Sequence, residues 1–192
     1  MIGNDIIDLK FAKINSRWRE QRFLDKLFSK EEKEFILSDR RHFQNIWHLW
    51  SMKESAYKIY ARQTDSPSFN PKYFHCEINS ITSGIVSFEG FKLNTNTQSD
   101  SNMIYTIAQH ANTPSVSGCI LLDGVSKPVR SQQLKDKAIE AFAVLKSVSK
   151  TAISIKKDHF GVPHFLINQE VQNNALTLTH HGQYGGFAIA YQ

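Results

Sequence analysis

The sequence predicts an α+β fold in which an antiparallel sheet packs against a long central helix. Apolar residues recur every three or four positions over 41–61, which is the pattern of a helix with one face against a core. Several short segments rich in strand-forming residues, separated by turn residues, follow after residue 72. No internal repeat or linker divides the 192 residues, so we expect one domain over 1–192.

The chain begins with a predicted strand over 1–9, since Ile2, Ile6 and Ile7 favour strands. A basic amphipathic helix is expected over 16–27, and Ser29 starts another short helix with a capping box, because Glu32 lies three residues on. After the long helix we expect a loop at 64–71, strands at 73–78, 84–93, 103–110, 116–122 and 152–156, a mobile polar loop at 94–102, a helix at 131–146, a turn at 161–163 and a closing hairpin of 176–180 with 186–191.

The composition is that of a globular protein in a reducing compartment. Hydrophobic residues make up 41% and charged residues 21% of the chain. No apolar run reaches the length of a membrane span, and the first residues lack the basic charge of a secretion signal. Cys76 and Cys119 have no metal-site spacing. We therefore expect a cytoplasmic protein with no membrane partner.

Positive charge is concentrated in the first third of the chain. The net charge is +5, and from Lys10 to Arg62 there are thirteen Lys or Arg against seven Asp or Glu. Such a surface attracts a nucleic acid, a phosphorylated cofactor or an acidic protein. Because no known nucleic-acid-binding motif is present, we rank nucleic acid last and expect none as a partner.

Glu54 lies in the apolar stripe of the long helix, among Trp47, Trp50 and Tyr57. A carboxylate in such surroundings must be protonated, pair with a cation or bind a metal, because burying a bare charge is prohibitive. Lys58, one turn on, is a candidate partner. Taken alone, this pattern is most often a structural ion pair.

A second carboxylate and a turn with two histidines favour a functional site over a structural ion pair. Asp5 shares a strand face with apolar neighbours. Two carboxylates on separate rigid elements suit Mg²⁺ bound to substrate phosphates, because Mg²⁺ takes few protein ligands. Thr179 and His180, followed by His181 and Gly182, offer donors for a further phosphate.

These segments, in this order, resemble the 4′-phosphopantetheinyl transferase superfamily. The similar segments are Gly3-Asn-Asp5-Ile6, Trp50-Ser-Met-Lys53-Glu54-Ser-Ala-Tyr57-Lys58, Gly161-Val-Pro163 and Thr179-His180-His181-Gly182. The order, with the metal strand first and the histidine turn last, is similar to that of the holo-acyl-carrier-protein synthase branch. The resemblance leaves about 73–150 as a poorly matched insertion.

The resemblance implies a reaction and the residues for it. Asp5 and Glu54 would bind Mg²⁺, and a serine of an apo acyl or peptidyl carrier protein would attack the β-phosphate of coenzyme A. The products would be phosphopantetheinyl-serine and adenosine 3′,5′-bisphosphate. Lys58 would stabilise the phosphate charge, Lys53 would assist or be solvated beside it, and Thr179 and His180 would hold the 3′-phosphate region, with Gly161 and Pro163 also in the coenzyme A site. Glu54, a water held by the metal and Asp8 remain open as the general base.

Three departures from the family pattern affect affinity and carrier choice. Ile7 replaces a second acidic ligand found in the two-lobed branch, so water or Asp8 would complete the metal shell. Val162 replaces a lysine, and Lys156 or Lys157 could substitute for it. Phe11 replaces an arginine that meets the carrier, which leaves a basic set for carrier binding: Lys10, Lys13, Arg17, Arg19 and Arg22.

Two further alternatives stay open at this point. The chain could share its sites across a homotrimer or complete its site alone, and the single copy of each motif favours an oligomer. It could also be a non-catalytic member of the fold that binds coenzyme A or a partner. The sequence does not distinguish fatty-acid, polyketide and peptide carriers.

Overall fold

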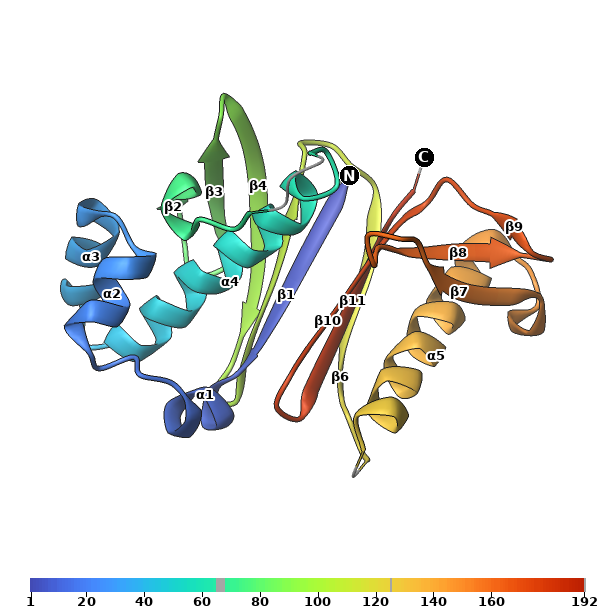
Figure 1. The fold of residues 1–192 in the computed structure, drawn as a ribbon, viewed down its shortest axis with the longest axis horizontal. Helices are drawn as coiled ribbons and strands as arrows, with labels where there is room; N and C mark the ends of the chain where they lie inside the picture. The colour runs from blue at the N-terminus through green and yellow to red at the C-terminus, as the bar shows by residue number, and fades with distance from the viewer. Residues whose placement is uncertain (65–67, 125, 192) are drawn as a thin grey trace.

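The first half of the chain forms a five-stranded antiparallel sheet crossed by a long helix. In this computed structural model, which describes residues 1–64, 68–124 and 126–191, the strand order is β1-β5-β4-β3-β2. The strands are β1 (Ile2–Asp8), β2 (His75–Ile78), β3 (Ser83–Phe88), β4 (Phe91–Ser99) and β5 (Met103–Gln109). Helix α4 (His42–Tyr60) packs against β1 and β5 (Figure 1). This confirms the predicted sheet and long helix.

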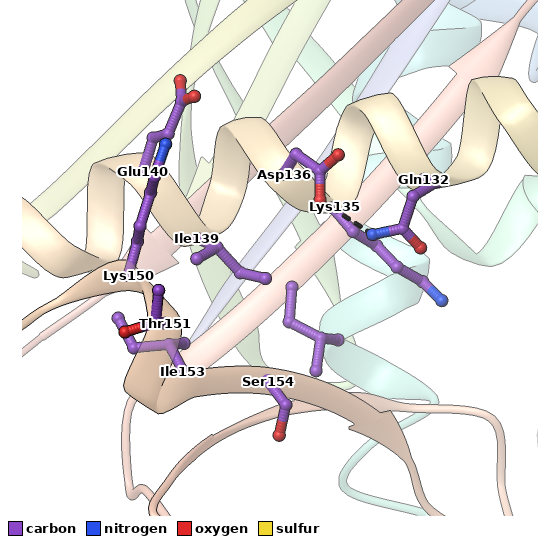
Figure 2. A pocket seen from close by; sticks show the side chains of 10 residues that line it. Gln132, Lys135, Asp136, Ile139, Glu140, Lys150, Thr151, Ile153 and Ser154 are labelled. Carbon is purple, nitrogen blue, oxygen red and sulfur yellow. Dashed lines mark hydrogen bonds between the residues drawn. The ribbon is translucent and has the colours of Figure 1, made fainter.

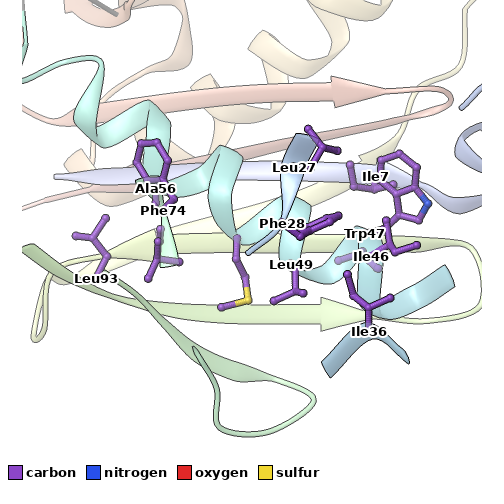
Figure 3. Packing of buried hydrophobic residues seen from close by; sticks show 14 of the residues in the cluster. Ile7, Leu27, Phe28, Ile36, Ile46, Trp47, Leu49, Ala56, Phe74 and Leu93 are labelled. Atoms are coloured by element: carbon purple, nitrogen blue, oxygen red, sulfur yellow. The ribbon is translucent and has the colours of Figure 1, made fainter. Parts of the chain in front are cut away.

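Three short helices contribute buried side chains to the apolar core that α4 shares with the sheet. They are α1 (Leu9–Asn15), α2 (Gln21–Leu27) and α3 (Lys30–Leu37), and a short 3₁₀ helix, η1 (Pro71–Tyr73), follows α4. Ser29 and Glu32 form the predicted capping box at the start of α3. The buried side chains of α2, α3 and α4 meet those of the sheet in one cluster (Figure 3). This packing fixes α4, and with it Glu54 and Lys58, against the sheet.

The second half has two smaller antiparallel sheets and one long helix. One sheet has the order β10-β11-β6 and the other β7-β8-β9. Helix α5 (Lys127–Lys146) covers β11 and β7, and Phe142 of this helix stacks on Phe165 with ring centroids 3.9 Å apart. The remaining bounds are β6 (Ser115–Leu121), η2 (Lys150–Ala152), β7 (Ile153–Lys157), β8 (Pro163–Ile167), β9 (Glu170–Val171), β10 (Ala175–His181) and β11 (Tyr184–Ala190).

The two halves meet where β1 lies between α4 and the β10–β11 hairpin (Figure 1). Every residue of β1 is buried. Gly3 permits the close approach to α4, because a Cβ atom at this position would lie 2.0 Å from the carbonyl oxygen of Ser55. The first strand is thereby held between the motif-bearing helix and the motif-bearing hairpin.

Four expectations about the elements were wrong. The helix predicted over 16–27 is α2 alone, and the unpredicted α1 begins earlier because Asp8 caps it by accepting from the backbone N–H of Phe11. The loop predicted at 94–102 is mostly strand β4, in which Thr95 and Thr97 are buried while Asn94, Asn96 and Gln98, which alternate with them, are exposed. The strand predicted at 84–93 is the hairpin β3–β4, and there are three sheets instead of one.

Several smaller expectations can be placed against the structure. Residues 65–67 of the loop predicted at 64–71 lie outside the described residues. The hairpin predicted at the end of the chain is confirmed as β10–β11. In the part of the chain that is described, no helix is long and apolar enough to cross a membrane.

Candidate active site

Asp5 lies at the centre of the junction between the two halves. The residue is 8% exposed, and its Oδ1 accepts a hydrogen bond of 3.1 Å from Thr179 Oγ1. Lys58 Nζ is 3.8 Å from the same oxygen. The other oxygen, Oδ2, is buried and has no hydrogen-bond partner among the described residues. One carboxylate oxygen is therefore held in place, while the other keeps its full capacity to accept a ligand.

Glu54 brings a second carboxylate to the same place from α4. Burial and, to a smaller extent, the negative charge of Asp5 raise the pKa of Glu54 to about 7, against the opposing effect of Lys58. Burial also raises the pKa of Asp5 to about 6, against the opposing effects of Lys58 and Thr179. Two carboxylates that repel each other in a desolvated site favour a cation between them. No cluster of three or more His, Cys, Asp or Glu fit for a metal occurs among the described residues.

Lys58 and Lys53 lie on different faces of α4. Lys58 is partly exposed, donates to the carbonyl oxygen of Asn4 and faces Asp5. Lys53 is fully buried: its Nζ is 2.8 Å from Glu32 Oε1 and donates to the carbonyl oxygens of Pro71 and Phe74. The expectation that Lys53 contacts coenzyme A or is solvated beside the site is therefore not met. Its ammonium ties α4 to α3 and to η1.

A polar network around Asn4, which the sequence did not single out, joins β1 to the last hairpin. Thr177 Oγ1 donates to Asn4 Oδ1 at 2.9 Å, and Asn4 Nδ2 donates to the hydroxyl of Tyr105 at 3.2 Å. Tyr105 in turn donates to the carbonyl oxygen of Phe187. Because all of these groups are buried, the network sets the register between Asp5 and Thr179. The one sequence signal that could have indicated this network is Asn4, a polar residue next to Asp5 in the predicted metal-binding strand.

The histidine turn is fastened to the end of β1 by Asp8 and His181. Asp8 Oδ1 accepts from Phe11 N–H, and Oδ2 accepts from Gln183 N–H at 3.0 Å. The backbone N–H of Asp8 donates to Nδ1 of His181 at 2.9 Å. Both oxygens of Asp8 are thus used to cap α1 and to hold the turn, which argues against Asp8 as general base or metal ligand.

Two adjoining pockets share the turn at 161–163, and Lys58 lines one of them. The first, of about 330 Å³, is lined by Tyr57, Lys58, Ala61, Arg62, Thr64, Phe160, Gly161, Val162, Pro163, Thr177 and Leu178. The second, of about 210 Å³, is lined by Arg130, Ser131, Leu134, Lys135, Lys157, Gly161, Pro163, Leu178 and His180. Gly161, Pro163 and Leu178 belong to both. The two form a continuous basic hollow, which we call the basic groove.

Besides Lys58, positive charge in the basic groove comes from residues that the motifs did not contain. Arg130 donates to the carbonyl oxygen of Gly182 at 3.0 Å and lies near His180. Burial, followed by the nearby positive charges of Lys127, Arg130, Lys58 and Lys157, lowers the pKa of His180. Lys157 lines the groove and pairs across the β7–β8 ladder with Pro163. Lys157 thus supplies the charge that Val162 lacks, whereas Lys156 does not line this groove.

The predicted carrier-binding residues are exposed on and between α1 and α2. They are Lys10, Lys13, Arg17, Arg19 and Arg22. Phe11 and Ile14 add exposed apolar surface, and the Phe11 ring stands edge-on to His181 at 5.1 Å. This face is continuous with the histidine turn, and so with the site around Asp5.

A larger hollow of about 540 Å³ lies away from these motifs, between α5 and β7 (Figure 2). Its charged side chains are of both signs, and Gln132 donates to Asp136 at 2.7 Å. None of the motif residues lines it. The candidate active site is therefore the Asp5–Glu54–Lys58 cluster with the basic groove.

All of these groups come from a single chain. Asp5, Glu54, Lys58 and Thr179 meet within it, and His180 borders the basic groove. A neighbouring subunit is not required to bring the motifs together, and the oligomeric state stays a prediction.

A sequence model described as the 4′-phosphopantetheinyl transferase superfamily matches residues 1–113, more than half of the chain. The chain belongs to this superfamily. Superfamily membership supports phosphopantetheinyl transfer as its general activity. The match includes the strand with Asp5 and the helix with Glu54 and Lys58. It ends before the histidine turn.

Structural and curated comparisons add less. The crystal structure of Thermotoga maritima holo-[acyl-carrier-protein] synthase is similar, with a TM-score of 0.42 and 10% sequence identity, covering 82% of this chain and 77% of that one. A search of curated proteins found no significant match.

Proposed function

We propose that the chain transfers the 4′-phosphopantetheine arm of coenzyme A to a serine of an apo acyl or peptidyl carrier protein. The observation that carries this proposal is the meeting of Asp5, Glu54 and Lys58 beside the basic groove, in a chain of the phosphopantetheinyl transferase superfamily. The two carboxylates, the Lys58 ammonium beside them and the basic groove match a diphosphate with an additional phosphate.

The residues present fit a magnesium ion. Asp5 Oδ2 is buried without a partner among the described residues, and Glu54 and Asp5 repel each other unless a cation lies between them. Asp5 and Glu54 would hold Mg²⁺, which prefers one or two carboxylates and the oxygens of substrate phosphates. Bound there, Mg²⁺ would neutralise charge on the diphosphate of coenzyme A.

The chain's own side chains bind and orient the substrate. Lys58, fixed by the carbonyl oxygen of Asn4, would attract the diphosphate and stabilise the charge that builds on the leaving phosphate. Arg130, Lys157 and His180 would bind the 3′-phosphate at the far end of the basic groove. Thr179 holds the Asp5 carboxylate in place and is a positioning residue. The family resemblance had instead implied that Thr179 holds the 3′-phosphate region of coenzyme A directly.

The transfer needs no reactant other than coenzyme A and the carrier serine. The serine oxygen forms a bond to the β-phosphorus, the bond from that phosphorus to the bridging oxygen breaks, and adenosine 3′,5′-bisphosphate leaves. The serine proton passes to a base. An acidic carrier would approach over α1 and α2, where the basic residues would speed its encounter. We expect the reaction in the cytoplasm, consistent with two free cysteines.

The experiment incubates the purified chain with Mg²⁺, coenzyme A and several apo carrier proteins, and measures carrier mass. We expect a gain equal to one phosphopantetheine arm, and we expect Glu54→Ala to abolish it. Asp39→Ala, a change of a partly exposed carboxylate outside the site, is the control and should retain transfer. Coenzyme A binding without transfer to any carrier would instead support a non-catalytic binding protein.

A further inference from the structure

Strand β7 has one edge that no other strand covers. Among the described residues it pairs only with β8, because the order of its sheet is β7-β8-β9. The hollow of about 540 Å³ between α5 and β7 is lined by residues of these two elements and of η2, and by none of β8 (Figure 2). The hollow therefore lies along the uncovered edge of β7, and we call it the edge groove.

The backbone of Ile155 faces the edge groove. The N–H of Asn168 donates to the carbonyl oxygen of Ala152 at 3.0 Å, so these two residues form a hydrogen-bonded pair at the start of the β7–β8 ladder. Every second residue of an antiparallel ladder bonds to the neighbouring strand. Ser154 and Lys156 therefore bond to β8, whereas the N–H and C=O of Ile155 point away from it.

The bonds on the other side of β8 agree with this assignment. Phe165, which lies opposite Ile155, accepts with its carbonyl oxygen from the backbone N–H of Gln172, beside β9. No loop or side chain in the part of the chain that the structure describes bonds to the N–H or C=O of Ile155. Unpaired backbone groups on an edge strand are a template for a further strand.

The two faces of β7 differ in polarity. Ile153 is buried and Ile155 is partly buried in the cluster under α5, and Ile139 of α5 lines the edge groove beside them. Ser154 and Lys156 are exposed on the opposite face. An added strand continues both faces of a sheet, so it needs apolar residues toward Ile139 and polar residues beside Lys156.

The charges around the edge groove favour an acidic strand. Its two carboxylates already have partners, since Asp136 accepts from Gln132 at 2.7 Å and Glu140 pairs with Lys137 at 2.8 Å. Three lysines on the same elements form no ion pair within residues 1–64, 68–124 and 126–191: Lys135, Lys150 and Lys156. A second copy of this edge would bring the same lysines together, so like charge disfavours self-association here.

We propose that the free edge of β7 is a docking site, which binds an extended acidic segment of a partner protein by strand addition. The backbone of the segment bonds to the N–H and C=O of Ile155. Its apolar residues contact Ile139, and the acidic residues that alternate with them lie beside Lys156. This docking is independent of the proposed transfer of phosphopantetheine.

The test uses the full ¹⁵N-labelled chain without coenzyme A, and the probe is the peptide acetyl-Glu-Val-Glu-Val-Glu-amide. We expect the peptide to shift the backbone amide signal of Ile155 and to slow its hydrogen exchange, because this N–H gains an acceptor. The N–H of Ser154 already bonds to β8, so its exchange is the internal control and should change little.

N-methylated peptides separate strand addition from attraction between charges. One peptide carries methyl groups on the valine nitrogens and another on the glutamate nitrogens, with the same net charge. Alternate N–H groups of an added strand point toward β7 and toward solvent. Only one of the two methylated peptides should therefore lose affinity, by about tenfold or more. An equal effect of both methylations would overturn strand addition.

A charge exchange locates the acidic residues of the segment. Lys156→Glu should weaken the acidic peptide about fivefold and strengthen a peptide with lysine in place of each glutamate. Lys92→Glu, at an exposed position on β4, changes the net charge equally and should affect neither peptide. The same affinity of the wild type for both peptides would contradict an acidic partner.

Two further results would overturn the proposal. Loss of the acidic peptide in Arg130→Gln would assign it to the basic groove, which shares Lys135 with the edge groove. Exchange at Ile155 that slows with rising protein concentration, without peptide, would show that a second copy of the chain covers the edge.

Discussion

Thr179 Oγ1 donates a hydrogen bond of 3.1 Å to Asp5 Oδ1, which joins two residues 174 positions apart. The contact links the first strand to the closing hairpin. It fixes one oxygen of Asp5 and leaves the other, Oδ2, without a partner among the described residues. The hairpin thus determines how the carboxylate of the first strand is presented.

Removing this hydroxyl should raise the pKa of Asp5. A hydrogen bond to a carboxylate favours the ionised form, so Thr179→Val loses that effect, while Thr179→Ser keeps it. We expect the pKa of Asp5 in the metal-free protein to rise from about 6 in Thr179→Val and to return in Thr179→Ser, as measured by carboxyl ¹³C chemical shifts. An unchanged pKa in the valine variant would show that Thr179 does not act on Asp5.

The raised pKa values of Asp5 and Glu54 make the metal-free chain less stable at alkaline pH. Both carboxyl groups bind protons more tightly in the folded than in the unfolded chain. Their contribution to the free energy of unfolding is therefore full below pH 3.8, the ordinary pKa of Asp, and is lost as the pH rises through about 6 and 7. Glu54→Gln should match the wild type in Tm at pH 4 and exceed it by roughly 3 °C at pH 8.

Measuring Tm with Mg²⁺ gives a second test of the charge effect at Asp5 and Glu54. Mg²⁺ should raise the Tm of the wild type at pH 8, because it binds the ionised pair, and should have little effect on Glu54→Gln. The same variant should lose transfer. A Tm difference that is equal at pH 4 and pH 8 would contradict a charge effect and indicate a packing effect instead.

Lys58 and Lys53 should respond differently to replacement by methionine. Lys58→Met should fold and lower kcat by about 100-fold or more, because it removes charge stabilisation beside the phosphate. Lys53→Met should cost about 3–5 kcal/mol of stability, because it leaves Glu32 buried without its cation. Denaturant unfolding with transfer rates separates the two. A folded Lys53→Met with wild-type stability would contradict the buried ion pair.

The basic groove predicts selectivity for the 3′-phosphate. Arg130→Gln and Lys157→Gln should each raise the KM for coenzyme A about tenfold and have little effect on dephospho-coenzyme A, which lacks this group. Lys156→Gln is the matched control, since Lys156 does not line the groove. Equal losses with both substrates would locate these side chains away from the 3′-phosphate.

Local patterns predicted much of the fold but little of the second half of the site. The capping box at Ser29 depends on residues a few positions apart, so it can be read from the chain. The long helix was also predicted, but its most deeply buried face carries Leu49, Met52, Ala56 and Ile59, whereas most of the stripe around Glu54 is only partly buried. Strand β4 could not be read from the chain, because Thr95 and Thr97 become inward-facing strand residues only beside β3 and β5. Arg130 and Lys157 belong to no local motif, and only the packing of α5 and β7 around the hairpin brings them to His180.

Lys53 is another residue whose role could not be predicted from the local sequence. Its place next to Glu54 in the motif suggested a role at the phosphate, yet neighbours in a helix point about 100° apart. Glu32, 21 positions earlier, captures its ammonium in the core. Its role therefore depends on where α3 packs, which the motif does not contain.

The exposed basic face of α1 and α2 should determine carrier affinity without affecting coenzyme A. Arg17→Glu combined with Arg22→Glu should raise the KM for an acidic carrier about tenfold, leave the KM for coenzyme A unchanged and reduce the dependence of the rate on ionic strength. Lys92→Glu combined with Lys137→Glu changes the net charge equally on other exposed elements, β4 and α5, and should have little effect. An equal loss in both double variants would show that the carrier responds to the total charge of the chain instead of to this face.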